Sequence, residues 1–136
     1  MTKKFLKLAP LGIPVYNRLD HTKKMINSLL QNELASMTEV YFFCDNYKNE
    51  KDKKLIEDVR SFIFSITGFK KKSIILRQIN YGLYRNTIEG INSILEKHEK
   101  FIWLEDDIVV SEFFLNFMNE SLNYYENEDK VMSITG

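Results

Sequence analysis

The acidic triplet Glu105-Asp106-Asp107 has the residue types and spacing expected of a metal site. It follows Leu104 and precedes Ile108 within an apolar segment, so its charges are expected to lie beside buried surface. Two carboxylates about 4 Å apart repel each other by up to about 4 kcal/mol at an effective dielectric constant of about 20, and a cation removes that conflict. Carboxylates that leave coordination positions to water and phosphate suit Mg²⁺ or Mn²⁺. The triplet therefore predicts a site for one of these two ions.

A second interpretation of the triplet is structural. Helices favour acidic residues in their first turn, and a helix is expected to start near Ser111. The triplet would then be a solvated loop or a source of favourable charge for that helix. Its position after an apolar segment favours the metal site, because polar residues follow three other apolar segments in the same way.

Those three polar groups are Asn17-Arg18, Asp45-Asn46 and a segment from Arg77 to Asn80. They follow the apolar segments 11–15, 39–44 and 73–76. Taken one at a time, Asp, Asn and Gly residues in such places are common turn formers. Four polar loops in equivalent positions favour a shared ligand site over four unrelated turns.

The elements that must position these loops alternate between strands and helices. Strands are predicted at 11–15, 39–44, 73–76 and 101–104, and a further strand is expected to begin within 131–135. Asp20 is a candidate cap for the first helix, the fourth helix is expected to start at Ser111, and Lys70 to Lys72 are expected to stay in solvent. The predicted apolar faces of the four helices are Met25, Ile26, Leu29 and Leu30; Leu55, Val59, Phe62, Ile63 and Ile66; Tyr84, Ile88, Ile91 and Leu95; and Phe114, Phe117, Met118, Leu122 and Tyr125.

This alternation predicts an α/β domain over 1–136, with a mostly parallel sheet and helices on both faces. In such a sheet, ligands bind outside the carboxyl ends of the strands, where the loops converge. The four polar loops are therefore expected to meet at one edge of the sheet.

The composition excludes several classes of function. The 19 basic and 19 acidic residues cancel, so no global charge attracts nucleic acid or an anionic membrane. The single cysteine, Cys44, lies in an apolar segment and is expected to be a small buried hydrophobe, which fits a reduced cytoplasmic compartment. No apolar run approaches the roughly 18 residues that span a bilayer, so no transmembrane segment is expected.

Two further groups of residues are assigned no chemistry. His21 and His98 lie in polar surroundings and are expected to be solvated. Aromatic residues at helical spacing are expected to be mostly core, with some left to face another part of a longer protein; they are Phe113, Phe114, Phe117, Tyr124 and Tyr125.

Taken in order, the motifs resemble those of GT-A glycosyltransferases, especially bacterial family 2 enzymes. They are Pro14-Val15-Tyr16-Asn17-Arg18, Cys44-Asp45-Asn46, Asn80-Tyr81-Gly82 with Arg85-Asn86, and Glu105-Asp106-Asp107. The resemblance covers nearly the whole chain. It implies a Rossmann-like GT-A fold, a three-layer α/β/α sandwich.

The resemblance also implies a role for each motif. Pro14, Val15, Tyr16 and Arg18 would frame the nucleotide base, while Asp45 would hydrogen-bond the base or the ribose. Asn80, Gly82, Arg85 and Asn86 match a segment that lies beside the nucleotide. The triplet resembles the DXD motif, in which Asp106 would meet the ribose or sugar and Asp107 would coordinate Mn²⁺ or Mg²⁺ on the diphosphate.

The implied activity is sugar transfer from a nucleoside diphosphate sugar, with UDP as the family-weighted choice, to a saccharide or lipid-linked acceptor hydroxyl with inversion. Members of the family continue into an acceptor-binding half that carries the catalytic base, so that base is expected beyond Gly136 and the full enzyme could lie at the membrane surface. The chain is accordingly expected to be the donor-binding part of a longer enzyme. The alternatives are a non-catalytic nucleotide-sugar-binding module and a nucleotidyltransferase, although the loop Tyr16-Asn17-Arg18 lacks the glycines of the latter.

Overall fold

The central sheet is parallel and four-stranded in the computed structural model, which describes residues 7–136. Its strands are β1 (Leu11–Val15), β2 (Glu39–Cys44), β3 (Lys71–Leu76) and β4 (Ile102–Trp103), in the order β3-β2-β1-β4. Every neighbouring pair is parallel. The predicted bounds of β1 and β2 are confirmed, whereas β3 begins two residues earlier than predicted and β4 is limited to two residues.

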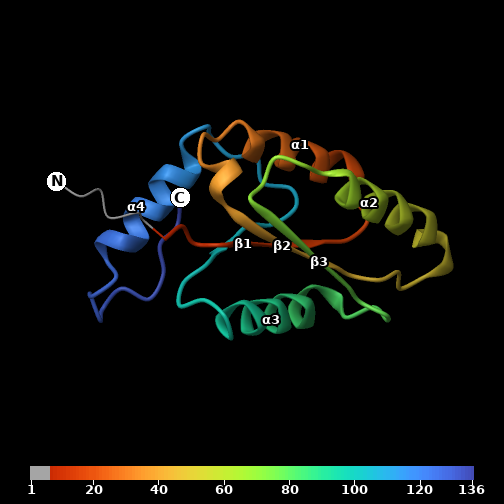
Figure 1. Cartoon of the computed structure of the whole chain (residues 1–136). Coiled ribbons are helices and arrows are strands. Elements are labelled where there is room, and N and C mark those ends of the chain that lie inside the picture. The colour runs from red at the N-terminus through yellow and green to blue at the C-terminus, as the bar shows by residue number, and fades with distance from the viewer. Residues whose placement is uncertain (1–6) are drawn as a thin grey trace.

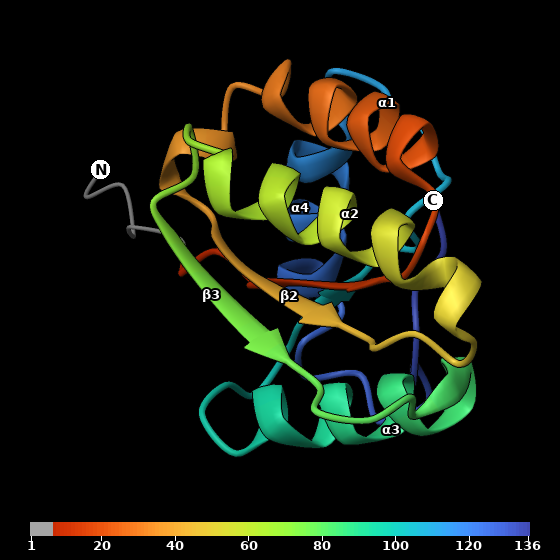
Figure 2. The same cartoon turned by 90° about the vertical axis from the view of Figure 1, so that its right-hand side faces the viewer.

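Helices cover both faces of this sheet (Figures 1 and 2). They are α1 (Leu19–Leu30), α2 (Lys53–Ser65), α3 (Gly82–Leu95) and α4 (Phe114–Tyr124), with short 3-10 turns η1 (Ala35–Met37) and η2 (Glu50–Asp52). In both views α1 and α2 lie on one side of the sheet and α3 on the other, and Figure 2 shows α4 on the side of α1 and α2. The predicted three-layer α/β/α arrangement is confirmed.

The alternation of β2 explains why both faces are buried. Val40, Phe42 and Cys44 belong to the large core shared with α1, α2 and α4, whereas Tyr41 and Phe43 belong to a smaller cluster on the α3 side. A strand that is covered on both faces has to be apolar throughout, as β2 is. Burial also raises the pKa of the Cys44 thiol to about 12, so Cys44 stays neutral and packs as a small hydrophobe, as predicted.

The prediction for α3 was wrong about which face is buried. Tyr84 is 82% exposed and Ile88 and Leu95 are also exposed, while Asn86, Gly90 and Ile94 are buried. A Cβ atom at position 90 would lie 2.9 Å from Trp103 Cη2, so the missing side chain lets the helix approach the sheet closely. The helix therefore turns its smallest residue, rather than its most apolar stripe, toward β4.

Other helix predictions need smaller corrections. Ile56 is buried in α2 where Leu55 was expected, and α4 begins at Phe114 after a turn rather than at Ser111. Asp20 lies in the first turn of α1 instead of capping it, because Arg18 precedes the helix and its carbonyl accepts the first hydrogen bond, from the Thr22 amide.

The strand expected to begin within 131–135 does not form. Residues 131–136 have no regular secondary structure and pair with no strand of the described sheet.

Most of the aromatic residues near α4 are not core. Phe113 is 67% exposed, and Phe117, Tyr124 and Tyr125 are also exposed, while Phe114 is partly buried. The buried positions of α4 are Leu115, Met118 and Asn119, a stripe on the other side of the helix.

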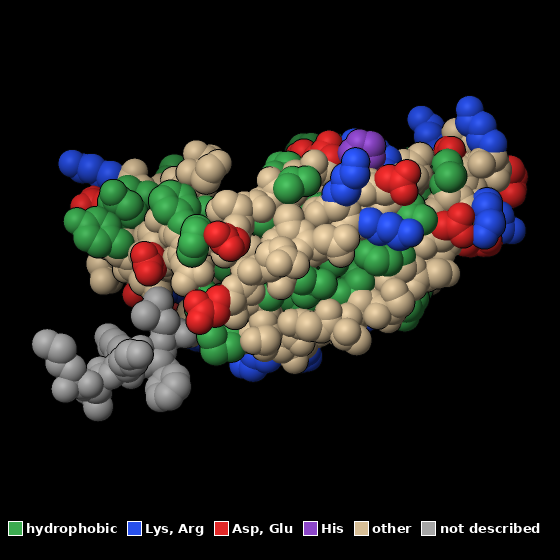
Figure 3. Space-filling model, turned by 90° about the horizontal axis from the view of Figure 1, so that it is seen from above, with side chains coloured by type: hydrophobic (Ala, Val, Ile, Leu, Met, Phe, Trp, Pro, Cys, Tyr) green, Lys and Arg blue, Asp and Glu red, His purple; other side chains and the backbone are tan. Residues whose placement is uncertain are grey.

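The surface of α1 and α2 agrees with the balanced charge of the sequence. Basic and acidic side chains are interspersed over the face seen in Figure 3.

The two histidines differ in their surroundings. His21 is exposed, as expected. His98 is not simply solvated, because its Nε2 lies 3.1 Å from the Tyr41 hydroxyl and its ring packs edge-on against that tyrosine. Within residues 7–136, no helix is long and apolar enough to cross a bilayer.

Lys72 is not in solvent, although Lys70 and Lys71 are. Its ammonium donates to the carbonyls of Ile63, Phe64 and Ile66 at 2.7 to 2.9 Å, at the end of α2. A lysine at a helix C-terminus satisfies carbonyls that have no partner within the helix. Burial lowers the pKa of Lys72, but the three carbonyl acceptors suit its charged form.

We expect Lys72→Met to lower the free energy of unfolding by about 1 to 3 kcal/mol, because three partly shielded carbonyls lose their donor. Lys71→Met, at the neighbouring exposed position, is the matched control and should stay within about 0.5 kcal/mol of the wild type. Urea unfolding followed by circular dichroism measures both. Equal effects of the two substitutions would contradict the assigned contacts.

Candidate functional site

A cleft of about 410 Å³ opens at the carboxyl edge of the sheet. Residues from the end of β1, from the loops after all four strands and from the start of α3 line it; they are Pro14, Val15, Tyr16, Arg18, Asp45, Lys48, Asn80, Gly82, Leu83, Asn86, Glu105 and Asp106. This is the edge at which a parallel sheet offers converging loops and helix N-termini to a ligand. The polar loops of the sequence therefore meet in one place, as predicted.

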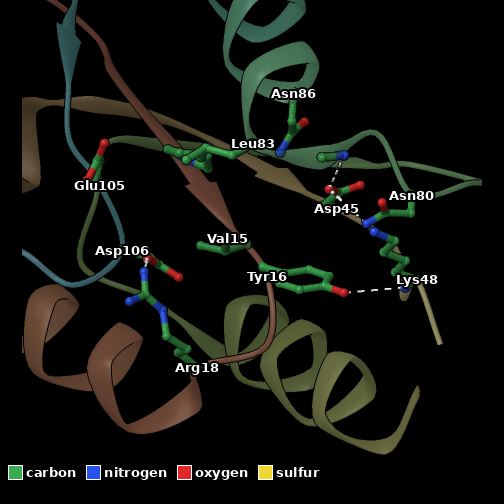
Figure 4. Close-up of a pocket in the computed structure, with 12 residues that line it drawn as sticks. Val15, Tyr16, Arg18, Asp45, Lys48, Asn80, Leu83, Asn86, Glu105 and Asp106 are labelled. Carbon is green, nitrogen blue, oxygen red and sulfur yellow. Dashed lines mark hydrogen bonds and ion pairs between the residues drawn. The ribbon is translucent and has the colours of Figure 1, made fainter. Parts of the chain in front are cut away.

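The two ends of the cleft differ in chemistry (Figure 4). Asp45, Asn80 and Asn86 lie toward one end, where backbone and amide groups predominate. Arg18 and Asp106 form an ion pair toward the other. Val15 and Tyr16 lie between them, and Lys48 lies at the Asp45 end, so a ligand that spans the cleft would meet amide groups and one lysine at one end and an ion pair at the other.

Asp45 is the organising residue of the first end. Only 5% of it is exposed, and both carboxylate oxygens accept hydrogen bonds. Oδ1 accepts from the amides of Asn46 and Tyr81 at 2.8 Å, and Oδ2 accepts from the Gly82 amide at 2.9 Å and from Asn80 Nδ2 at 3.3 Å. An acid from the loop after β2 thus holds the loop that begins α3.

Gly82 makes this arrangement possible. Its φ angle is +76°, in the left-handed region that side chains with a Cβ disfavour. That conformation lets the Gly82 and Tyr81 amides point together at Asp45. The helix start is therefore stabilised by a carboxylate from another loop, near the positive end of the helix dipole.

Two polar side chains, the buried Asn86 and the partly buried Arg60, fix the ends of β2 and β3. Asn86 donates through Nδ2 to the Phe43 carbonyl at 3.0 Å and accepts from Arg77 Nε at 2.9 Å. Arg60, from α2, donates to the carbonyls of Asp45 and Arg77 at 3.1 and 2.9 Å. The loops after both strands are thus held by side chains from helices on opposite faces of the sheet.

The charged end is built from Asp106, Asp107 and Arg18. Arg18 Nη2 lies 2.6 Å from Asp106 Oδ1, and Nη1 lies 3.1 Å from Asp107 Oδ2. The Asp106 side chain is 7% exposed, whereas Asp107 is more open to solvent. Burial raises the pKa of Asp106 above its usual value, Arg18 opposes that rise, and the charge of Asp107 adds to it.

The structure brings together seven of the eight residues predicted to bind a nucleotide, namely Pro14, Val15, Tyr16, Arg18, Asp45, Asn80 and Asp106. Arg85 does not line the cleft: it pairs with Glu89 at 2.8 Å and stacks on the Tyr81 ring. Asp107, the predicted metal ligand, lies beside the cleft and is linked to it through Arg18. The binding roles of all these residues remain predictions.

Some cleft residues had no assigned role in the sequence. Lys48 follows Asp45 by three residues in the same loop, and its amide is bonded to the Tyr16 hydroxyl at 3.3 Å. Leu83 is an exposed leucine directly after Gly82. Both residues lie near a predicted site loop in the sequence, and that was the only signal for them. The sequence does not show which residues of a loop point into a cleft and which point into solvent.

Solved structures share this fold, while no protein-family model and no curated protein matches the chain. A crystal structure of TarS, a glycosyltransferase of S. aureus, aligns with a TM-score of 0.58 and 15% identity over 88% of this chain and 20% of that one. A structure of TarS residues 1–349 aligns with a TM-score of 0.59 and 13% identity over 95% of this chain and 38% of that one. At such identities the likeness concerns the fold, and this chain spans less than two fifths of either TarS chain.

Proposed function

We propose that this chain is the donor-binding part of a glycosyltransferase and binds a nucleoside diphosphate sugar in the cleft. The observation that carries the proposal is the cleft itself, which joins a hydrogen-bonding end to a carboxylate pair at the carboxyl edge of a parallel sheet. The fold shared with TarS supports the same class of activity.

The polarity of the cleft sets the proposed direction of the ligand. The base and ribose lie toward Asp45 and Asn80, with Tyr16 alongside, and the diphosphate lies toward Arg18 and Asp106. Because the Asp45 carboxylate already has four donors, its proposed role is to hold the loop 80–82 in the shape that meets the nucleoside. Direct contacts then come from exposed atoms of that loop and of Tyr16.

The residues present fit a divalent ion bound together with the diphosphate. Asp106 and Asp107 supply neighbouring carboxylates, and residues 7–136 contain no cluster of three or more metal-ligating side chains. The remaining ligands would therefore be water and phosphate oxygens, which is the coordination that Mg²⁺ and Mn²⁺ prefer. Such an ion stabilises the negative charge of a departing nucleoside diphosphate.

The proposed reaction is transfer of the sugar to an acceptor hydroxyl with inversion. The acceptor is a saccharide or a lipid-linked sugar, and the donor is a UDP-sugar. This chain's residues bind and orient the donor; the general base that deprotonates the acceptor hydroxyl is proposed to come from outside it.

Calorimetry with UDP tests this proposal. We expect UDP to bind about tenfold or more tightly with saturating Mn²⁺ than with EDTA, because the ion bridges the carboxylates and the diphosphate. Uridine, which lacks the diphosphate, is the control and should show no dependence on Mn²⁺. Equal affinities for UDP with and without the metal, or no binding at all, would overturn the proposed site.

A further inference from the structure

Arg18 contacts the two carboxylates that are proposed to hold the divalent ion. Its guanidinium contacts the carboxylates of two consecutive residues, at 2.6 Å from Asp106 and 3.1 Å from Asp107. A divalent ion that used both carboxylates would lie against the guanidinium, and the two cations would repel each other. Arg18 and the ion are therefore competitors for one pair of acids.

The backbone and the side chain of Arg18 differ in how firmly they are held. Its carbonyl accepts from both the amide and the hydroxyl of Thr22, at 3.0 and 2.9 Å, and Thr22 is fully buried. The side chain, by contrast, is 46% exposed and lines the cleft. The guanidinium can thus leave the carboxylates while its backbone stays at the start of α1.

The charges explain why such an exchange is favourable. Asp106 is nearly buried, and an unneutralised carboxylate in that position is costly, so a cation beside it stabilises the fold. A divalent ion on the same carboxylates neutralises them more fully and repels the guanidinium. A planar guanidinium donates two parallel N–H bonds to a phosphate as readily as to a carboxylate, so a diphosphate in the cleft offers Arg18 a new partner.

We propose that Arg18 is a displaceable counter-ion, which neutralises Asp106 and Asp107 until a divalent ion takes them and which then binds the diphosphate. This inference rests on the proposed function and assigns Arg18 two successive partners. It makes Arg18 a positioning residue that couples metal binding to nucleotide binding. It predicts that removing the guanidinium changes the two affinities in opposite directions.

The test compares wild type, Arg18→Gln and Arg18→Lys, with Lys54→Gln as the control because Lys54 is exposed, ion-paired with Asp58 and outside the cleft. Mn²⁺ alone is titrated and the free ion is followed by electron paramagnetic resonance. We expect Arg18→Gln to bind Mn²⁺ about three- to fivefold more tightly than wild type, because the competing cation is gone. Calorimetry with UDP at saturating Mn²⁺ should then show about tenfold weaker binding, because the phosphate contact is gone.

Arg18→Lys keeps the charge but cannot donate two parallel hydrogen bonds. Each affinity should therefore change in the same direction as in Arg18→Gln, but by less. It also provides the readout if circular dichroism shows that Arg18→Gln does not fold. Unchanged or weaker Mn²⁺ binding in the variants, or unchanged UDP binding, overturns the exchange even when wild type binds both ligands as proposed. If wild type binds UDP without any dependence on Mn²⁺, the proposed metal site fails and the exchange fails with it.

Discussion

Replacing both Asp106 and Asp107 by alanine is expected to abolish the effect of Mn²⁺ on UDP affinity. The ratio of affinities with and without the metal should fall from about tenfold or more to about one, because no carboxylate pair remains to hold the ion. The prediction follows from the position of Asp106 in the cleft and from the guanidinium that joins it to Asp107. Calorimetry with and without EDTA measures the ratio.

The single variant Asp106→Asn separates binding from stability. Because burial raises the pKa of Asp106 despite the nearby arginine, the folded protein disfavours the charged carboxylate. A neutral amide of the same shape should therefore not lower the free energy of unfolding at neutral pH, while it should weaken metal-dependent UDP binding. Glu112→Ala, at an exposed acid outside the cleft, is the control for both measurements. Loss of metal dependence in the control, or its persistence in the double alanine variant, would contradict the assignment.

Asp45→Ala is expected to lower both stability and UDP affinity. Four donors converge on the carboxylate, and three of them are backbone amides. Removing their acceptor should cost about 2 to 4 kcal/mol of unfolding free energy, since hydrogen bonds to charged groups contribute about 1.5 to 3 kcal/mol each and water can replace some of them. UDP affinity should fall about tenfold or more both with and without Mn²⁺, because the loop 80–82 loses its shape.

The control for Asp45 is Asp58→Ala, which removes a solvent-accessible i,i+4 ion pair with Lys54 and should cost at most about 0.5 kcal/mol. Urea unfolding and calorimetry measure both variants. The organising role of Asp45 would be refuted by a variant that keeps wild-type stability. A variant that is destabilised but binds UDP as tightly as wild type would instead remove the loop 80–82 from the binding site.

The sequence predicted the structure correctly where a local pattern of residues is compatible with only one element. The bounds of β1 and β2 were predicted to the residue because their apolar runs end in polar loops. A strand that is buried on both faces has few polar residues within it, so the first polar loop residue marks its end. The rule that parallel strands present their carboxyl ends to one edge then brought Asp45 and Asp106 into one cleft. That inference needed topology but no side-chain geometry.

Features that depend on tertiary packing were not predictable. The buried face of α3 is set by the fit of Gly90 against Trp103, which outweighs the apolar stripe read from helical spacing. The prediction that Lys72 is solvated was wrong because its partners are backbone carbonyls, and every residue type carries a carbonyl, so the sequence gives no sign of them. Arg18 and Asp106 are separated by 88 positions, so their pairing appears only when β1 and β4 lie side by side.

Paramagnetic broadening by Mn²⁺ tests the central claim, that carboxylates after β4 hold a divalent ion in the cleft that binds the nucleoside diphosphate. The measurement compares amide spectra of the ¹⁵N-labelled protein with UDP and either Mg²⁺ or Mn²⁺. We predict that Mn²⁺ removes the signals of residues 105–107 and 17–19 first, while those of residues 45–46 and 80–82 shift on adding UDP and are broadened less. Broadening centred elsewhere on the protein, or UDP-induced shifts that avoid both ends of the cleft, would contradict the account.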